Sequence, residues 1–223
     1  MKDCKLVFYS GGQLSKNQHI HKELVRLVGN KKKITMTYVP FCHDNHKIFF
    51  ARAIKRYAKF GVTDFHCLPV DIHVGPAKIK KLVKSDIIYL AGGNTYYFLK
   101  YLRKSKVFHS LRDYVKNGGV LGGLSAGGII MSPHIELAGY PSFDHHADEN
   151  EVGLKRKGGL NLVNFEFYPH YTSSPRLDKA LKDYSLQSKY PIIACHDGSG
   201  VVVEGKNRQI LGEFKIFHRG QKI

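Results

Sequence analysis

The sequence predicts an α/β fold: a three-layer, doubly wound, mostly parallel sheet with a small antiparallel extension at its C-terminal end. Short apolar segments rich in β-branched residues alternate with longer segments of helical periodicity, which is the pattern of βαβ units. The chain has 223 residues, of which 43% are hydrophobic and 24% are charged. A chain of this length can bury a stable core without disulfides or structural metals. We therefore expect a single domain over residues 1–223.

The first half of the chain is expected to alternate five strands with helices. The predicted strands are Lys5–Ser10, Lys33–Val39, Asp64–Val70, Asp86–Leu90 and Val120–Leu124. The predicted helices run from an N-cap at Ser15 to Gly29, from a cap at Asp44 to Phe60, over Pro76–Ser85 and over Asn94–Lys116. Gly61 can supply a left-handed stop for the second of these helices.

The pattern is looser in the second half. Ser132–Gly159 contains Pro, Gly and acidic residues and is predicted to form a long loop. A strand at Phe165–Phe167, a helix at Pro175–Gln187 and a strand at Ile192–Cys195 are expected to follow. The last predicted elements form an antiparallel meander, namely Val201–Glu204, Gln209–Leu211 and Glu213–Phe217.

Composition excludes several classes of protein. No apolar run approaches the roughly 18 residues that cross a bilayer, and the short first apolar segment does not resemble a signal peptide. Four cysteines without C-x-x-C spacing, Cys4, Cys42, Cys67 and Cys195, indicate buried, reduced thiols and a cytoplasmic protein without a membrane partner. The net charge of +17 favours polyanion binding, but no zinc-finger spacing or RNP-type motif indicates a specific nucleic-acid partner.

The most informative segment is Gly123-Leu124-Ser125-Ala126-Gly127, which has the pattern G-x-S-x-G. It lies where a predicted strand meets a predicted helix, the context in which a strained turn presents a nucleophilic serine above the sheet. Only small residues fit two positions before and after such a serine, because helix and strand approach closely there. Ser125 is therefore the candidate nucleophile.

A serine hydroxyl needs a base, and the base needs an orienting carboxylate. His170 and Asp197 each follow a predicted strand, and the carboxyl ends of strands in a parallel sheet share one edge. The backbone amides of Gly93, in a second glycine turn, and of Ala126 could form an oxyanion hole. An alternative assignment follows the residue order of the α/β hydrolases. Ser125 is still the nucleophile, but Asp197 is the acid, His218 is the base and the reaction is ester hydrolysis.

Four segments together resemble the peptidase E (alpha-aspartyl dipeptidase) family of serine peptidases, which is related to the cyanophycinases. They are Ala-Gly-Gly-Asn-Thr at 91–95, Gly-Leu-Ser-Ala-Gly at 123–127, Tyr-Pro-His at 168–170 and Asp-Gly at 197–198. The resemblance implies a fold similar to class I glutamine amidotransferase domains. It also implies a catalytic set of Ser125, His170 and an acid at the position of Asp197, where the best-known relatives carry Glu.

The same resemblance implies a short peptide substrate and an acyl-enzyme intermediate, with no cofactor. Arg176 is the nearest match to the basic residue that binds an acidic substrate side chain in aspartyl dipeptidases, and a guanidinium suits a carboxylate. His145 and His146 lie in an acidic loop segment, but adjacent residues point apart and no zinc signature has this spacing, so no metal is expected. A basic nucleic-acid-binding protein without catalysis is the alternative from another class.

Overall fold

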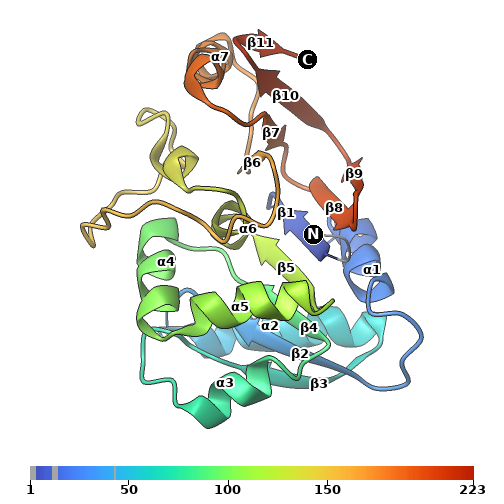
Figure 1. Cartoon of the computed structure of the whole chain (residues 1–223). Helices are drawn as coiled ribbons and strands as arrows, with labels where there is room; N and C mark the ends of the chain where they lie inside the picture. The colour runs from blue at the N-terminus through green and yellow to red at the C-terminus, as the bar shows by residue number, and fades with distance from the viewer. Residues whose placement is uncertain (1–3, 12–14, 43) are drawn as a thin grey trace.

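The computed structural model describes residues 4–11, 15–42 and 44–223 (Figure 1). Its strands are β1 (Lys5–Tyr9), β2 (Ile34–Val39), β3 (Val62–Cys67), β4 (Ile87–Leu90), β5 (Val120–Leu124), β6 (Glu166–Tyr168), β7 (Ile192–Cys195), β8 (Gly200–Glu204), β9 (Asn207–Leu211), β10 (Phe214–His218) and β11 (Gln221–Lys222). Its α-helices are α1 (Gln18–Arg26), α2 (His46–Tyr57), α3 (Pro76–Leu82), α4 (Thr95–Lys104), α5 (Val107–Lys116), α6 (Ala126–Met131) and α7 (Pro175–Gln187). Two 3-10 helices, η1 (Ala58–Phe60) and η2 (Glu136–Gly139), complete the assignment.

The main sheet has the strand order β3-β2-β4-β5-β1-β8-β9. The first five strands of this order pair in parallel, and β8 and β9 extend the sheet in antiparallel fashion beside β1. A mostly parallel α/β sheet was predicted, and the structure confirms it. The more specific likeness to class I glutamine amidotransferase domains stays a prediction.

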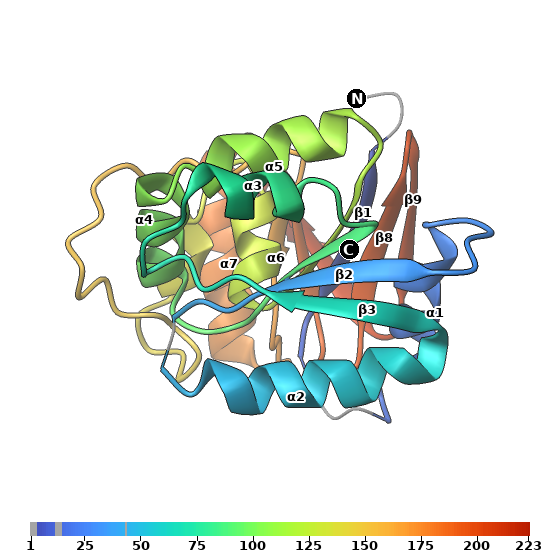
Figure 2. The ribbon, with the colours of Figure 1, turned by 90° about the horizontal axis from the view of Figure 1, so that it is seen from below.

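Helices cover both faces of the main sheet, which gives three layers (Figure 2). Alternating residues of β1 divide between the two faces. Leu6 and Phe8 pack with residues of α3, α4, α5 and α6, whereas Val7 and Tyr9 pack with residues of α1 and α2. This alternation follows from the two-residue period of a strand.

A second sheet of four strands, in the order β11-β10-β7-β6, lies beside the main one (Figure 1). Its β6 and β7 are parallel, and β10 is antiparallel to β7. The predicted C-terminal meander is therefore wrong in part, because β10 does not continue from β9 but crosses to pair with β7. Gly212, with φ of 84°, lies in the connection between β9 and β10.

Two predicted helix caps are also wrong. The N-cap of α1 is Asn17 rather than Ser15, and the N-cap of α2 is Asn45 rather than Asp44; neither asparagine side chain makes a capping hydrogen bond. Gly61 has φ of 92° and ends η1, as predicted. The helical patterns predicted over Asn94–Lys116 form two helices, α4 and α5, which Lys106 separates with a φ of 65°.

The four cysteines all lie in the described residues and form no disulfide. Cys4 and Cys195 are buried, as expected, but Cys42 and Cys67 are only partly buried. Over the described part of the chain, the helices are all too short or too polar to cross a membrane.

Candidate active site

Ser125 occupies a sharp turn between β5 and α6. Its backbone has φ of 48° and ψ of −110°, and its amide donates to the carbonyl of Tyr9 on β1 over 2.8 Å. A Cβ atom on Gly123 would lie 2.6 Å from the carbonyl carbon of Gly127. A Cβ on Gly127 would lie 2.6 Å from the carbonyl oxygen of Leu90. Strand and helix therefore approach as closely as the G-x-S-x-G pattern predicts.

His170 lies two residues after the end of β6 and contacts both other predicted members of the set. Its Nε2 is 2.9 Å from the Oγ of Ser125, and its Nδ1 is 2.7 Å from Oδ1 of Asp197. The side chain of His170 is 21% exposed and that of Asp197 is 45% exposed, so the pair lies at the edge of the protein interior. The structure thus brings together the three residues that the sequence singled out.

The three residues do not all belong to one sheet, as the sequence argument assumed. Ser125 follows a strand of the main sheet, whereas His170 and Asp197 follow β6 and β7 of the second sheet. The buried Ser10, directly after β1, joins the two: its Oγ accepts from the amide of His170 and donates to the carbonyl of Cys195, both over 2.7 Å. The segments that follow β1, β6 and β7 therefore meet, although β1 belongs to one sheet and β6 and β7 belong to the other.

Ser10 and Gly11 were not singled out by the sequence, although both follow the central strand β1. A Cβ atom on Gly11 would lie 2.3 Å from Cε1 of His170 and 2.7 Å from Oδ1 of Asp197. The backbone at Gly11 therefore packs directly against the imidazole–carboxylate pair. Their position at the carboxyl end of a central strand was the signal that could have found them.

The two predicted oxyanion donors flank Ser125. Ala126 begins α6, so its amide has no partner within the helix. Gly93 has φ of 139°, and a Cβ there would lie 2.2 Å from a ring carbon of Phe41, so the turn requires glycine. Neither amide donates to an acceptor among the described residues.

A cavity of about 320 Å³ opens beside Ser125. Ser125, His170 and Gly93 line it together with the segment around η2 and the following loop. The ring of His146 stacks on that of His170, with 4.5 Å between their centroids and 23° between their planes. Burial and the neighbouring His170 lower the pKa of His146. The loop containing His146 is therefore part of the site.

Arg176 lies at the start of α7 and does not line this cavity. Its guanidinium carbon is 3.8 Å from the centroid of the Phe143 ring, in the loop between η2 and β6. His218, the base of the alternative set, lies at the end of β10, pairs with Gln221 of β11 and lines neither cavity that contains His170. The carboxylate of Asp197 contacts His170 instead.

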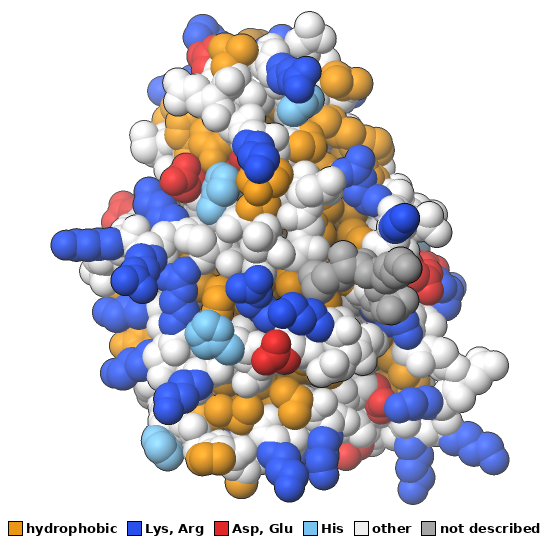
Figure 3. Space-filling model, in the orientation of Figure 1, with side chains coloured by type: hydrophobic (Ala, Val, Ile, Leu, Met, Phe, Trp, Pro, Cys, Tyr) orange, Lys and Arg blue, Asp and Glu red, His pale blue; other side chains and the backbone are white. Residues whose placement is uncertain are grey.

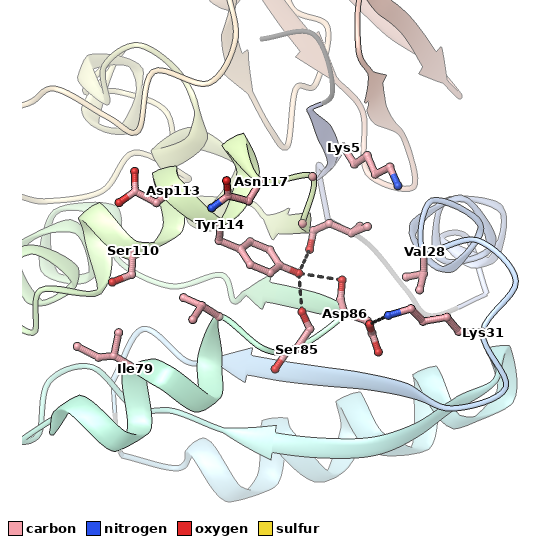
Figure 4. Close-up of a pocket in the computed structure, with 14 residues that line it drawn as sticks. Lys5, Val28, Lys31, Ile79, Ser85, Asp86, Ser110, Asp113, Tyr114 and Asn117 are labelled. Atoms are coloured by element: carbon pink, nitrogen blue, oxygen red, sulfur yellow. Dashed lines mark hydrogen bonds and ion pairs between the residues drawn. The ribbon is translucent and has the colours of Figure 1, made fainter.

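A larger cavity of about 510 Å³ lies at the opposite edge of the main sheet, where β4 and β5 begin (Figure 4). The hydroxyl of Tyr114 lies there within hydrogen-bond distance of the carbonyl oxygens of Ser85, Asp86 and Val120 and donates to one of them at a time, and Lys31 pairs with Asp86. The tyrosine contact ties α5 to the sheet. No group of three metal-ligating side chains occurs among the residues that the structure describes.

Comparison with known proteins places the chain in a family. The model of peptidase family S51 matches residues 6–211. The chain belongs to peptidase family S51. This membership confirms the resemblance to peptidase E that the four motifs indicated.

Individual relatives agree with this assignment. An uncharacterized peptidase of Pasteurella multocida is 29% identical over 136 residues, and the match spans 60% of this chain and 64% of that protein. Peptidase E of Streptomyces coelicolor is 24% identical over 202 residues, or 83% of this chain and 75% of that protein. The crystal structure of a peptidase from an acI-B1 Actinobacterium has a TM-score of 0.71 at 19% identity, covering 99% of this chain and 94% of that chain, and shares the fold.

Proposed function

We propose that the protein is a serine peptidase that hydrolyses short peptides through a Ser125–His170–Asp197 triad. The observation that carries the proposal is the position of His170, whose two ring nitrogens lie within hydrogen-bond distance of Ser125 and Asp197. An imidazole held in this way can accept the proton of the Ser125 hydroxyl while the carboxylate fixes its tautomer. Membership of peptidase family S51 supports the same chemistry.

The reaction begins when Oγ of Ser125 attacks the scissile carbonyl and His170 takes its proton. The amides of Gly93 and Ala126 are free to donate to the oxyanion that forms. His170 then protonates the leaving amine, and water hydrolyses the acyl-enzyme with His170 as base. Every step uses a group beside the cavity.

Two other functions have less support. Ester hydrolysis through His218 has no support in the geometry, since His218 lines neither of the two cavities that contain His170. The net charge of +17 favours polyanions, but Figure 3 shows Lys and Arg side chains spread over the visible face among other types rather than gathered in one stripe. Such a surface supports only salt-sensitive, non-specific binding.

An alkyl fluorophosphonate probe tests the proposal. The hydroxyl of Ser125 is expected to displace fluoride and form an Oγ–P bond while His170 takes the proton, which adds the mass of the probe less HF at Ser125. The variant Ser125→Ala should not be labelled, whereas Ser110→Ala, which changes a serine of α5 at the opposite edge of the sheet, should be labelled like the native protein. Equal labelling of the native protein and Ser125→Ala would remove Ser125 from the mechanism.

A further inference from the structure

We infer that the cavity beside Ser125 binds the N-terminal residue of the peptide, with the carboxylate of Asp148 receiving its α-ammonium group and an uncharged first side chain lying in the cavity. The inference rests on the proposed function and narrows its substrate class. It predicts peptides with a free amino terminus and a neutral first residue, rather than aspartyl peptides.

The cavity is lined by both apolar and polar side chains. Six of its residues present aliphatic or ring surfaces: Ile129, Leu137, Ala138, Tyr140, Tyr168 and Pro169. Of the described residues that line the cavity, none is Lys or Arg, and Asp148 is the one carboxylate. Three histidines, His145, His146 and His170, also line it. An acidic side chain would therefore enter beside a carboxylate without a Lys or Arg to pair with, and burying a poorly paired charge is unfavourable.

Asp148, in the loop after η2, is hydrogen-bonded to the turn that contains the oxyanion donor Gly93. Its Oδ2 accepts from the amide of Thr95 over 2.9 Å, and the carbonyl of the next residue, Glu149, accepts from Nδ2 of Asn94 over 2.8 Å. In a peptide, the α-amino nitrogen of the first residue is two bonds from the carbonyl carbon that follows it. A carboxylate anchored beside the oxyanion donor is therefore suitably placed for the ammonium group of the residue whose carbonyl is attacked.

The charges around the cavity agree with this assignment. Burial raises the pKa of the Asp148 carboxyl, since its charged form is poorly solvated there. A substrate ammonium would supply the missing counter-charge. The neighbouring His146 has a lowered pKa because of burial and the adjacent His170, so it does not supply a permanent cation.

Arg176, the residue predicted to bind an acidic substrate side chain, contacts an aromatic ring instead. The guanidinium of Arg176 lies on the ring of Phe143, and the residue does not line the cavity. This contact holds the loop that contains Asp148 rather than presenting a charge to the substrate.

Diphenyl phosphonate analogues of amino acids test the inference, because the Ser125 hydroxyl forms an Oγ–P bond with them, phenoxide leaves and His170 accepts the proton. The native protein is expected to react at least about tenfold faster with the leucine analogue than with its N-acetyl derivative or the aspartate analogue. Asp148→Asn keeps an oxygen for the Thr95 amide. It should slow the free-amine leucine probe about tenfold and the N-acetyl probe less than twofold.

Glu149→Gln, at the adjacent exposed carboxylate, is the matched control and should change neither rate. A faster reaction with the aspartate analogue would overturn the inference, as would an equal loss for both leucine probes in Asp148→Asn. Labelling by the alkyl fluorophosphonate distinguishes failure of this inference from failure of the serine peptidase assignment. If it labels Ser125 and selectivity for the free amine is absent, the inference fails and the peptidase assignment stands. If no phosphonate labels Ser125, both fail.

Discussion

The Oγ of Ser125 lies 2.9 Å from Nε2 of His170, although 45 residues separate them in the chain and they follow strands of different sheets. The contact depends on how the two sheets are joined. Ser10, at the end of β1, bonds to the amide of His170 and to the carbonyl of Cys195, two residues before Asp197. One buried hydroxyl thus connects the strand ends that carry the imidazole and the carboxylate.

Replacing His170 should abolish turnover without unfolding the protein. We expect His170→Ala to lower kcat by about 10⁴-fold, because among the described residues only His170 lies within hydrogen-bond distance of the Ser125 hydroxyl. His218→Ala is the matched control, and its kcat should stay within about twofold of the native value. Steady-state kinetics on a short peptide decide between the two histidines. A larger loss in His218→Ala than in His170→Ala would support the α/β-hydrolase set instead.

Asp197→Asn should leave the fold intact and still impair the reaction strongly. The amide keeps the shape of the carboxylate but cannot stabilise an imidazolium, and the comparable change in a serine protease lowers kcat by about 10⁴-fold. KM should change little, since Asp197 contacts His170 rather than the cavity beside Ser125. Asp183→Asn, on the exposed side of α7, serves as the control. An unchanged kcat in Asp197→Asn would mean that another group orients His170.

A methyl group on Gly11 should displace the imidazole–carboxylate pair. The added Cβ would lie 2.3 Å from Cε1 of His170, a distance that requires the ring to shift. We expect Gly11→Ala to reduce kcat by about 10²-fold or more, because small misplacements of reacting groups cost rates of this size. Gly75→Ala places its Cβ no closer than 3.7 Å to His73 and should retain full activity. Crystal structures or kcat values of both variants check the prediction, and native activity in Gly11→Ala would contradict it.

Much of the site could be predicted from the sequence because its residues follow predicted strands and have glycine or proline close to them in the chain. The turn at Ser125 has glycines at the positions where the helix approaches the strand, and Asp197 precedes a glycine with φ of 90°. Such local constraints are visible in one segment of sequence. They located the main chemical groups without any knowledge of how the sheets pack.

The sequence could not predict relationships that arise between distant segments. The crossing of β10 to the second sheet depends on which edge is free to pair, and alternation alone does not reveal that. The stacking of His146 on His170 and the anchoring of Asp148 to Thr95 depend on the path of a long loop. For the same reason, Arg176 was expected at the substrate although its side chain lies on Phe143.

Acid should destabilise the protein through His21, a buried residue of α1 that lies against Tyr9, Tyr57 and Phe60. Burial lowers its pKa to about 3, compared with an ordinary value of 6.5. The unfolded chain therefore binds a proton at His21 between these pH values and the folded protein does not, so stability falls as the pH drops below about 6.5. The expected contribution is about 2 kcal/mol of unfolding free energy lost between pH 7 and pH 5.

Urea unfolding of the native protein and of His21→Gln at both pH values measures this contribution. His21→Gln removes the titrating group, so its unfolding free energy should fall by about 2 kcal/mol less than the native value over the same interval, whatever its stability at pH 7. His19→Gln changes an exposed histidine on the same helix and should follow the native pH dependence. If His21→Gln loses as much stability between pH 7 and pH 5 as the native protein does, His21 is not the group whose protonation opposes folding.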